Sequence, residues 1–113
     1  MAKKIQPNLN DCPLEECLRL LNGAWTPKIL WYLSTETKRF GDLKRDLGNI
    51  SAKVLTTRLR ELEDLDVLRR EVLPTSPPTV QYSLNELGRR LKPVLDAIAE
   101  VGKELKKRER RLK

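Results

Sequence analysis

Apolar residues in the first third of the chain recur at helical spacing. After Pro13 they occupy positions i, i+3, i+4 and i+7, which form one face of a helix: Leu14, Cys17, Leu18 and Leu21. Pro13 suits the first position of this helix, with Asp11 or Cys12 as its cap. Thr26-Pro27 repeats the pattern of a cap followed by a proline, and residues 29–33 behind it are apolar nearly all round. The pattern predicts two helices, of which the second is central and buried.

A polar turn is expected at residues 34–37, and two more helices follow it. The segment 40–47 is predicted to be a short helix with three inward side chains: Phe40, Leu43 and Leu47. Gly48-Asn49 breaks it, and Ser51 is a natural N-cap for a longer helix that continues to about Leu65. Two helices joined by a glycine-containing turn are a candidate helix-turn-helix.

The periodicity then changes from helical to alternating. Residues 67–73 are strand-like, 74–78 form a proline-rich turn, and in 79–84 apolar and polar residues alternate as in a half-buried strand. A β-hairpin here would occupy the place of a wing. The last stretch, 85–113, is predicted to be helical, with a kink or a split at Pro93.

These elements predict a mainly α protein with a small β-hairpin, an α+β winged helix-turn-helix. The chain is long enough for one domain. We assign a polar N-terminal tail to residues 1–11, the domain to 12–102, and a basic C-terminal helix extension to 103–113.

The charge balance favours a polyanionic partner. The chain has 23 lysines and arginines against 16 aspartates and glutamates, a net charge of +7. Each phosphate that a basic group neutralises releases a condensed counterion, which favours binding to nucleic acid. A merely solvated, soluble surface is the alternative from charge alone.

Several classes of function are excluded by what the sequence lacks. There is no histidine, and two cysteines do not complete a tetrahedral zinc site, so no metal site, cofactor or catalytic constellation is expected. No apolar run approaches the roughly 20 residues that span a bilayer, and the start of the chain does not resemble a signal peptide. We therefore expect a cytoplasmic protein that is not an enzyme.

The helix after Ser51 has the asymmetry of a DNA-reading helix. One stripe is apolar and would face the core: Leu55, Leu59 and Leu62. Another face is free of acids and bears Lys53, Thr56, Thr57 and Arg60, while the acidic residues gather at the C-terminal end. Such a helix can present its N-terminal part to the major groove, with Ser51 and nearby N–H groups at a phosphate. An ordinary solvated face is the alternative.

Further basic residues lie around this face in the predicted fold. They are candidates for contacts to the DNA backbone, which fix register without reading sequence. Those that we place in the DNA-binding set are Arg39, Arg58, Arg69 and Arg70; Lys38, Lys44 and Arg45 are further basic residues of the same region.

Several motifs, taken in order, resemble the HxlR-type family of bacterial and archaeal regulators. They are Cys12-Pro13, 22–25 leading into 29–33, 38–43, 50–63 and 77–88, and the likeness covers about residues 12–102. The resemblance implies a dimeric winged helix-turn-helix of MarR-like architecture that binds inverted-repeat operators. Three positions depart from the family pattern: Ala24 and Thr79 stand where basic residues are common, and Asp66 stands in a turn that often contains glycine. Lys28 is a substitute for the first of these, and Asp tolerates a left-handed backbone.

The last helix carries a short heptad pattern. Its apolar positions fit an a/d register: Leu91, Val94, Ile98, Val101 and Leu105. The resemblance implies dimerisation through the terminal helices, so we add Leu14 and Leu95 to the predicted interface. The alternative is a helix that packs on its own domain.

The two cysteines have different expected roles. Cys17 lies on an apolar stripe, where a free cysteine behaves as a small hydrophobe. Cys12 lies at a helix N-terminus, which favours the reactive thiolate. The resemblance implies that a cysteine at this position can sense quinones, aldehydes or oxidants. Structural capping is the alternative for Cys12.

The sequence therefore predicts a homodimeric, sequence-specific DNA-binding transcriptional regulator on an inverted-repeat operator, with Cys12 as a candidate redox or electrophile sensor. The alternative is a winged-helix module that binds proteins and does not read DNA. No small-molecule effector can be named, because the aromatic residues are expected in the core rather than around a pocket: Trp25, Trp31, Phe40 and Tyr82.

Overall fold

The computed structural model describes residues 12–112, with side chains through residue 111. The predicted tail 1–11, including Asp11, lies outside the described residues. The helices are α1 (Pro13–Leu21), α2 (Thr26–Thr35), α3 (Phe40–Leu47), α4 (Ala52–Asp64), α5 (Glu86–Arg89) and α6 (Lys92–Leu112). The strands are β1 (Lys38–Arg39), β2 (Leu68–Leu73) and β3 (Thr79–Leu84).

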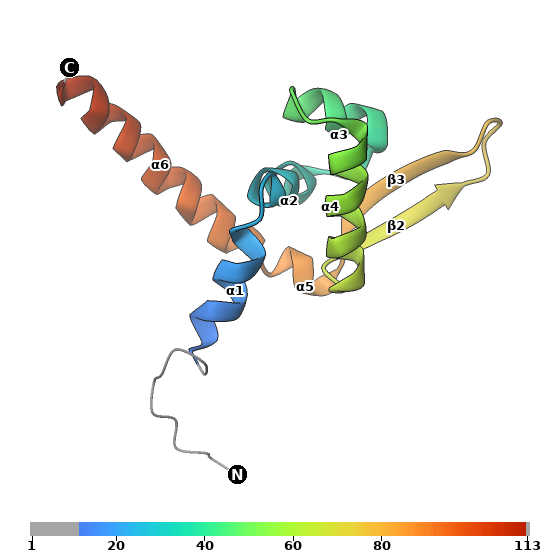
Figure 1. The fold of residues 1–113 in the computed structure, drawn as a ribbon, viewed down its shortest axis with the longest axis horizontal. Helices are drawn as coiled ribbons and strands as arrows, with labels where there is room; N and C mark the ends of the chain where they lie inside the picture. The colour runs from blue at the N-terminus through green and yellow to red at the C-terminus, as the bar shows by residue number, and fades with distance from the viewer. Residues whose placement is uncertain (1–11, 113) are drawn as a thin grey trace, which may run out of the picture.

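α2 lies at the centre of the fold, as its apolar sequence predicts. Ile29 and Leu30 have no exposed surface, and Leu33 has 4 %. The inward side chains of α3 and α4 complete the core around α2, together with those at the base of the sheet: Leu43, Leu47, Leu55, Leu59, Leu62, Val67, Leu68, Tyr82 and Leu84. This single core holds the helix-turn-helix, α3–α4, against the sheet (Figure 1).

The sheet has three antiparallel strands in the order β1-β3-β2. β2 and β3 form the predicted hairpin, with Leu68 opposite Leu84 and Leu73 opposite Thr79. β1 was not predicted: its two residues pair with the far side of β3, Lys38 opposite Tyr82. The hairpin projects from the body as a wing, away from α6 (Figure 1).

Two sequence-based boundaries shift. The turn expected at residues 34–37 begins later, because Ser34 and Thr35 complete α2 and their hydroxyls donate to the carbonyls of Trp31 and Tyr32. The cap of α2 is Trp25, in the left-handed region at φ 73°, rather than Thr26.

The C-terminal helical stretch is split before its proline. α5 ends at Arg89 and α6 begins at Lys92, which places Pro93 in the first turn of α6. A proline is tolerated there because its missing N–H would have no partner within the helix. α6 then runs without interruption through residue 102 into the basic extension, and leads away from the rest of the fold (Figure 1).

Candidate nucleic-acid interface

α4 is fixed by its cap and its buried stripe, which together leave the predicted reading face outward. The N–H of Val54 donates to Ser51 Oγ at 3.1 Å, so Ser51 caps the helix as expected. Leu55, Leu59 and Leu62 are at most 1 % exposed. The first turn contains no acid, which leaves a positive helix N-terminus uncompensated within α4.

The predicted reading residues share one surface of α4 but differ in availability. Lys53, Thr57 and Arg60 are exposed, and Thr56 is half-buried. The Thr57 hydroxyl donates to the carbonyl of Lys53 at 3.0 Å, so its oxygen remains an acceptor while its hydrogen is engaged within the helix. Lys53, Thr56 and Arg60 are therefore the donors most available to an external acceptor.

The wing presents its two arginines differently. Arg70 lies opposite Tyr82 and Arg69 opposite Ser83, and successive residues of a strand point to opposite faces. Arg70 borders the space beside α4, whereas Arg69 is exposed with its guanidinium 4.0 Å from the Glu71 carboxylate. Only Arg70 belongs to the same concave surface as α4.

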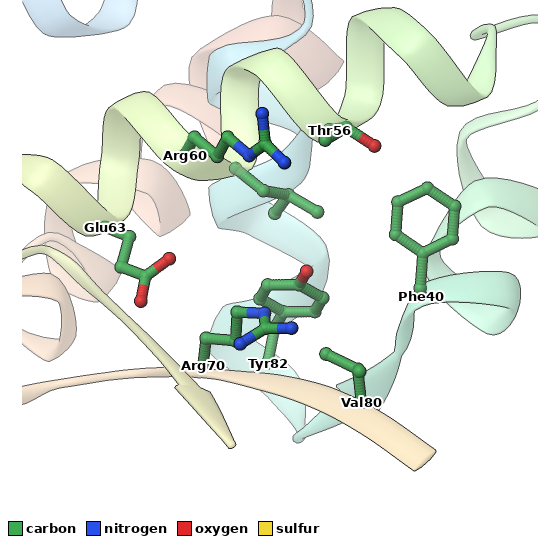
Figure 2. A pocket seen from close by; sticks show the side chains of 8 residues that line it. Phe40, Thr56, Arg60, Glu63, Arg70, Val80 and Tyr82 are labelled. Carbon is green, nitrogen blue, oxygen red and sulfur yellow. The ribbon is translucent and has the colours of Figure 1, made fainter. Parts of the chain in front are cut away.

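A pocket of about 460 Å³ lies between α4 and the wing (Figure 2). Its lining combines polar groups with aromatic and aliphatic side chains: Phe40, Thr56, Leu59, Arg60, Glu63, Arg70, Val80 and Tyr82. Phe40 and Tyr82 were expected in the core alone. They do contact the core, yet each also presents part of its ring to this pocket.

Arg58, a member of the predicted DNA-binding set, is engaged inside the protomer. Its Nε donates to the carbonyl of Ala24 at 3.0 Å, and its guanidinium lies 3.1 Å from the Glu61 carboxylate. Its side chain is 27 % exposed. These contacts tie α4 to the turn before α2, so the geometry favours a positioning role for this arginine.

The basic residues around β1 also divide into paired and exposed ones. Lys38 Nζ lies 2.7 Å from Asp46 Oδ2, and this hydrogen bond raises the pKa of Lys38 above its ordinary value of 10.5. The pair links β1 to the end of α3. Arg45 pairs with Asp42 in the same helix, while Arg39 is exposed beside the N-terminus of α3. The ammonium of Lys28 stands 5.3 Å from the ring centroid of Trp25, the residue that follows Ala24.

α6 carries a row of exposed apolar side chains. Val94, Ile98, Val101 and Leu105 are between 41 % and 60 % exposed. The other two predicted interface residues of this stretch, Leu91 and Leu95, pack on the protomer's own core, and Leu95 is only 3 % exposed. The outward row lies along one side of the helix, as a seam for a partner requires.

α1 is also amphipathic, with little of its surface covered. Leu14 and Leu18 are 66 % and 61 % exposed. Cys12 and Cys17 are both half-buried thiols. The side chain of Cys12 makes no capping hydrogen bond, although its carbonyl accepts from the N–H of Glu15. Cys12 therefore occupies the N-cap position of α1, as predicted, without using its thiol as the cap.

Metal-ligand clusters and membrane helices are not found in the part of the chain that the structure describes. Within residues 12–112 no three His, Cys, Asp or Glu side chains converge on a metal position. Nor does any helix of that range combine the length and apolarity needed to cross a membrane.

Comparison with known proteins agrees with this arrangement. A family model described as HxlR-like helix-turn-helix matches residues 20–110. The chain belongs to this family. YybR of Bacillus subtilis, an uncharacterized HTH-type transcriptional regulator, is 38 % identical over 100 residues, which are 88 % of this chain and 80 % of YybR.

Solved structures show the same architecture. A protein from Porphyromonas gingivalis assigned to the MarR family of transcriptional regulators superimposes with a TM-score of 0.80 at 33 % identity, over 90 % of this chain and 98 % of that one. The oxidized form of the redox regulator HypR superimposes with a TM-score of 0.77 at 36 % identity, over 82 % and 96 % of the two chains. The HxlR-like assignment confirms the resemblance and the winged helix-turn-helix fold that the sequence predicts. Since the matched relatives are regulators, the family also confirms that the chain is not an enzyme.

Proposed function

We propose that this HxlR-like protein is a homodimeric transcriptional regulator that binds an inverted-repeat operator, with α4 of each protomer in the major groove. The observation that carries the proposal is the outward face of α4. It joins a positive, acid-free N-terminal half to exposed basic and hydroxyl side chains on a helix held rigidly by the core.

The contacts divide by chemistry. Lys53, Thr56, Thr57 and Arg60 face the base edges and the nearest phosphates, and Ser51 lies at a phosphate beside the N-terminus of α4. Arg39 and Arg70 neutralise backbone phosphates on either side of α4, and Arg69, on the outer face of the wing, reaches at most a phosphate beyond that surface. Arg58 contributes by holding α4 in place.

Dimerisation follows from the outward apolar rows of the terminal helices. An apolar seam on α6 with four side chains about half exposed is costly to leave in water, and a second copy of α6 offers a matching seam. Leu14 and Leu18 of α1 are likewise exposed apolar side chains, and they supply a second apolar surface for the proposed interface. A twofold dimer would place the two recognition helices about 34 Å apart, one turn of DNA.

Cys12 is proposed to make the regulator responsive to oxidants or electrophiles. Its thiol is half-buried, close to the N-terminus of α1, and is not used as a cap. Because α1 is proposed to lie at the dimer interface, a covalent change at Cys12 would alter the geometry between the two recognition helices. The similar structure named redox regulator HypR supports this type of control.

The competing function is a winged-helix module that binds proteins. The acid-free basic face of α4 favours DNA instead, because a protein surface offers fewer regularly spaced anions than a duplex does.

The test is a selection of bound duplexes from random DNA, followed by titration of the winning sequence by fluorescence anisotropy. We expect an inverted repeat, and a loss of about 5- to 150-fold in affinity for Lys53→Ala, as for a lost base or phosphate contact. Lys107→Ala, in the exposed extension of α6, is the matched control and should bind within about twofold of the wild type. If no sequence is enriched, or if the two variants lose affinity equally, reading through α4 is wrong.

A further inference from the structure

A second groove lies at the C-terminal end of α4, away from the proposed reading residues. It has a volume of about 380 Å³ and runs between the end of α1, the turn before α2 and the last turns of α4. We propose that this groove receives the C-terminal end of α6 from a second copy of the chain. The docking rests on the dimer proposed above, and adds contacts that this dimer would make beyond the α6 seam.

The groove has an apolar floor and an exposed apolar edge. Leu62 is 1 % exposed, and Leu20 packs partly against the core, so both are held in place. Leu65, which caps α4, is 57 % exposed at the edge. An apolar side chain of another molecule placed against Leu65 would remove its surface from water, which favours association.

The charged residues of the lining leave one carboxylate without a partner. Glu61 lies 3.1 Å from the guanidinium of Arg58, and Arg19 lies 3.2 Å from the carboxylate of Glu16. Asp64 is exposed and takes part in no ion pair among the residues that the structure describes. The groove therefore offers an acid beside an exposed leucine, a surface that attracts a cation and repels DNA.

The sequence of α6 contains the complementary pair of residues. The a and d positions of its heptads are apolar from Leu91 to Leu105, but the next d position is Arg108. An arginine in the middle of an apolar seam is costly unless an acid pairs with it. A seam between two copies of α6 should therefore end before Arg108, and the last turns of each helix need an acidic partner elsewhere.

Arg108 and Leu105 are both available for such a contact. Nε of Arg108 lies 3.4 Å from a carboxylate oxygen of Glu104, in a pair that is largely exposed and contributes little stability. The remaining N–H groups of this guanidinium can still bind a second carboxylate. Leu105 is 58 % exposed and lies one turn earlier on the same side of α6. Leucine and arginine on α6 thus match Leu65 and Asp64 at the groove.

The occupant has to come from another molecule. The C-terminal ends of α6 and α4 lie far apart on opposite sides of α2, so one protomer cannot place its own α6 end in its own groove (Figure 1). In a twofold dimer each copy would supply one groove and one helix end, and both grooves would be filled by the same contact. The end of α6 would then touch the recognition helix of the other copy.

The test is a charge-reversal cycle on the full chain without DNA, with the dimer dissociation constant measured by analytical ultracentrifugation. Asp64→Arg and Arg108→Asp should each weaken the dimer about tenfold, because each change brings two like charges together. The double variant exchanges the two charges and should return to within about threefold of the wild type. Glu63→Arg is the matched control, because Glu63 adjoins Asp64 but lines the pocket beside the wing. It should not rescue Arg108→Asp.

The apolar half of the contact is tested by Leu65→Ser, which should weaken the dimer severalfold. Leu87→Ser, which removes an exposed leucine of α5, should leave it unchanged. Unchanged association in both charge variants, or rescue by Glu63→Arg as strong as by Asp64→Arg, would overturn the docking. If the wild type is a dimer in either case, the proposed function stands and only the docking is wrong. A wild type that stays monomeric would refute both.

Discussion

Gly88 stands so close to Val67 that a Cβ on its backbone would lie 2.2 Å from the Val67 carbonyl oxygen. That oxygen also accepts from the N–H of Asn85 at 3.2 Å. The Asn85 side-chain amide donates to the carbonyl and carboxylate oxygens of Asp66, at 2.5 Å and 2.9 Å. The turn after α4, with Asp66 in the left-handed region at φ 59°, is thereby bound to the start of α5.

Gly88→Ala is expected to lower the free energy of unfolding by about 1–3 kcal/mol, because the obstructing atom is backbone and cannot rotate away. Urea denaturation followed by circular dichroism measures this. Gly41→Ala is the control: apart from its chain neighbours and the backbone of its own helix, no atom of the described residues lies within 4 Å of its added Cβ. The free energy of unfolding should therefore be unchanged or rise by up to about 1 kcal/mol. Equal stability of the Gly88 variant and the wild type would show that the turn and α5 are not locked together.

Lys38→Gln is expected to destabilise the fold at neutral pH by removing the ion pair to Asp46. The pKa of Lys38 is raised in the folded protein, so the pair contributes fully below the ordinary value of 10.5 and is lost as the pH rises through the raised value. The difference in unfolding free energy between wild type and variant should therefore be larger at about pH 8 than at about pH 11.5. Lys44→Gln removes a lysine of α3 that takes part in no ion pair among the described residues, so as the matched control it should leave the free energy of unfolding at about pH 8 nearly unchanged.

Ile98→Glu should convert the proposed dimer into a monomer. A carboxylate in the centre of an apolar seam would be buried without a partner, which costs about 3–5 kcal/mol and weakens association at least about 100-fold. Analytical ultracentrifugation across a concentration series reads this directly. Helical periodicity places Lys107 on the opposite side of α6 from Ile98, so Lys107→Glu should stay dimeric. A wild type that sediments as a monomer at all concentrations would contradict the interface itself.

Cys12→Ser should abolish a response of operator binding to diamide or a quinone. In the wild type we expect the oxidant to change the affinity for the selected operator by about 5- to 150-fold, the usual range of coupling between two sites. Cys17→Ser should respond like the wild type, since Cys17 lies further along the apolar side of α1. If the Cys12 variant responds as strongly as the wild type, sensing through this thiol is wrong.

Local patterns predicted the local elements well. The bounds of α3 and the cap of α4 follow from Phe40, Gly48 and Ser51, because helix ends depend on residues a few positions apart. Asp66 replaces glycine in a left-handed turn for an equally local reason. The sequence did not predict β1, because two residues are too few to show an alternating pattern. Lys38 adopts strand structure only because it pairs with Tyr82, which lies far along the chain.

The sequence predicted which types of residue form the site more readily than it predicted which groups those residues contact. The basic face of α4 is visible in the sequence, but the engagement of Arg58 with the Ala24 carbonyl depends on how α4 packs against the turn before α2. The pocket was missed for the same reason. Phe40 and Tyr82 have the composition of a core, and only the separation of α4 from the wing leaves part of each ring uncovered.

β3 is hydrogen-bonded to β2 on one edge and to β1 on the other, and β1 runs directly into α3. β1 thus ties the base of the wing to the helix-turn-helix, because a displacement of β3 at Gln81 and Tyr82 would break its pairing with Lys38 and Arg39. In the proposed complex, the spacing between α4 and the base of the wing would therefore be set within each protomer. If the proposed dimer binds an operator whose two half-sites are spaced differently, the difference would have to be taken up by movement between subunits, at the interface that α1 and α6 would make.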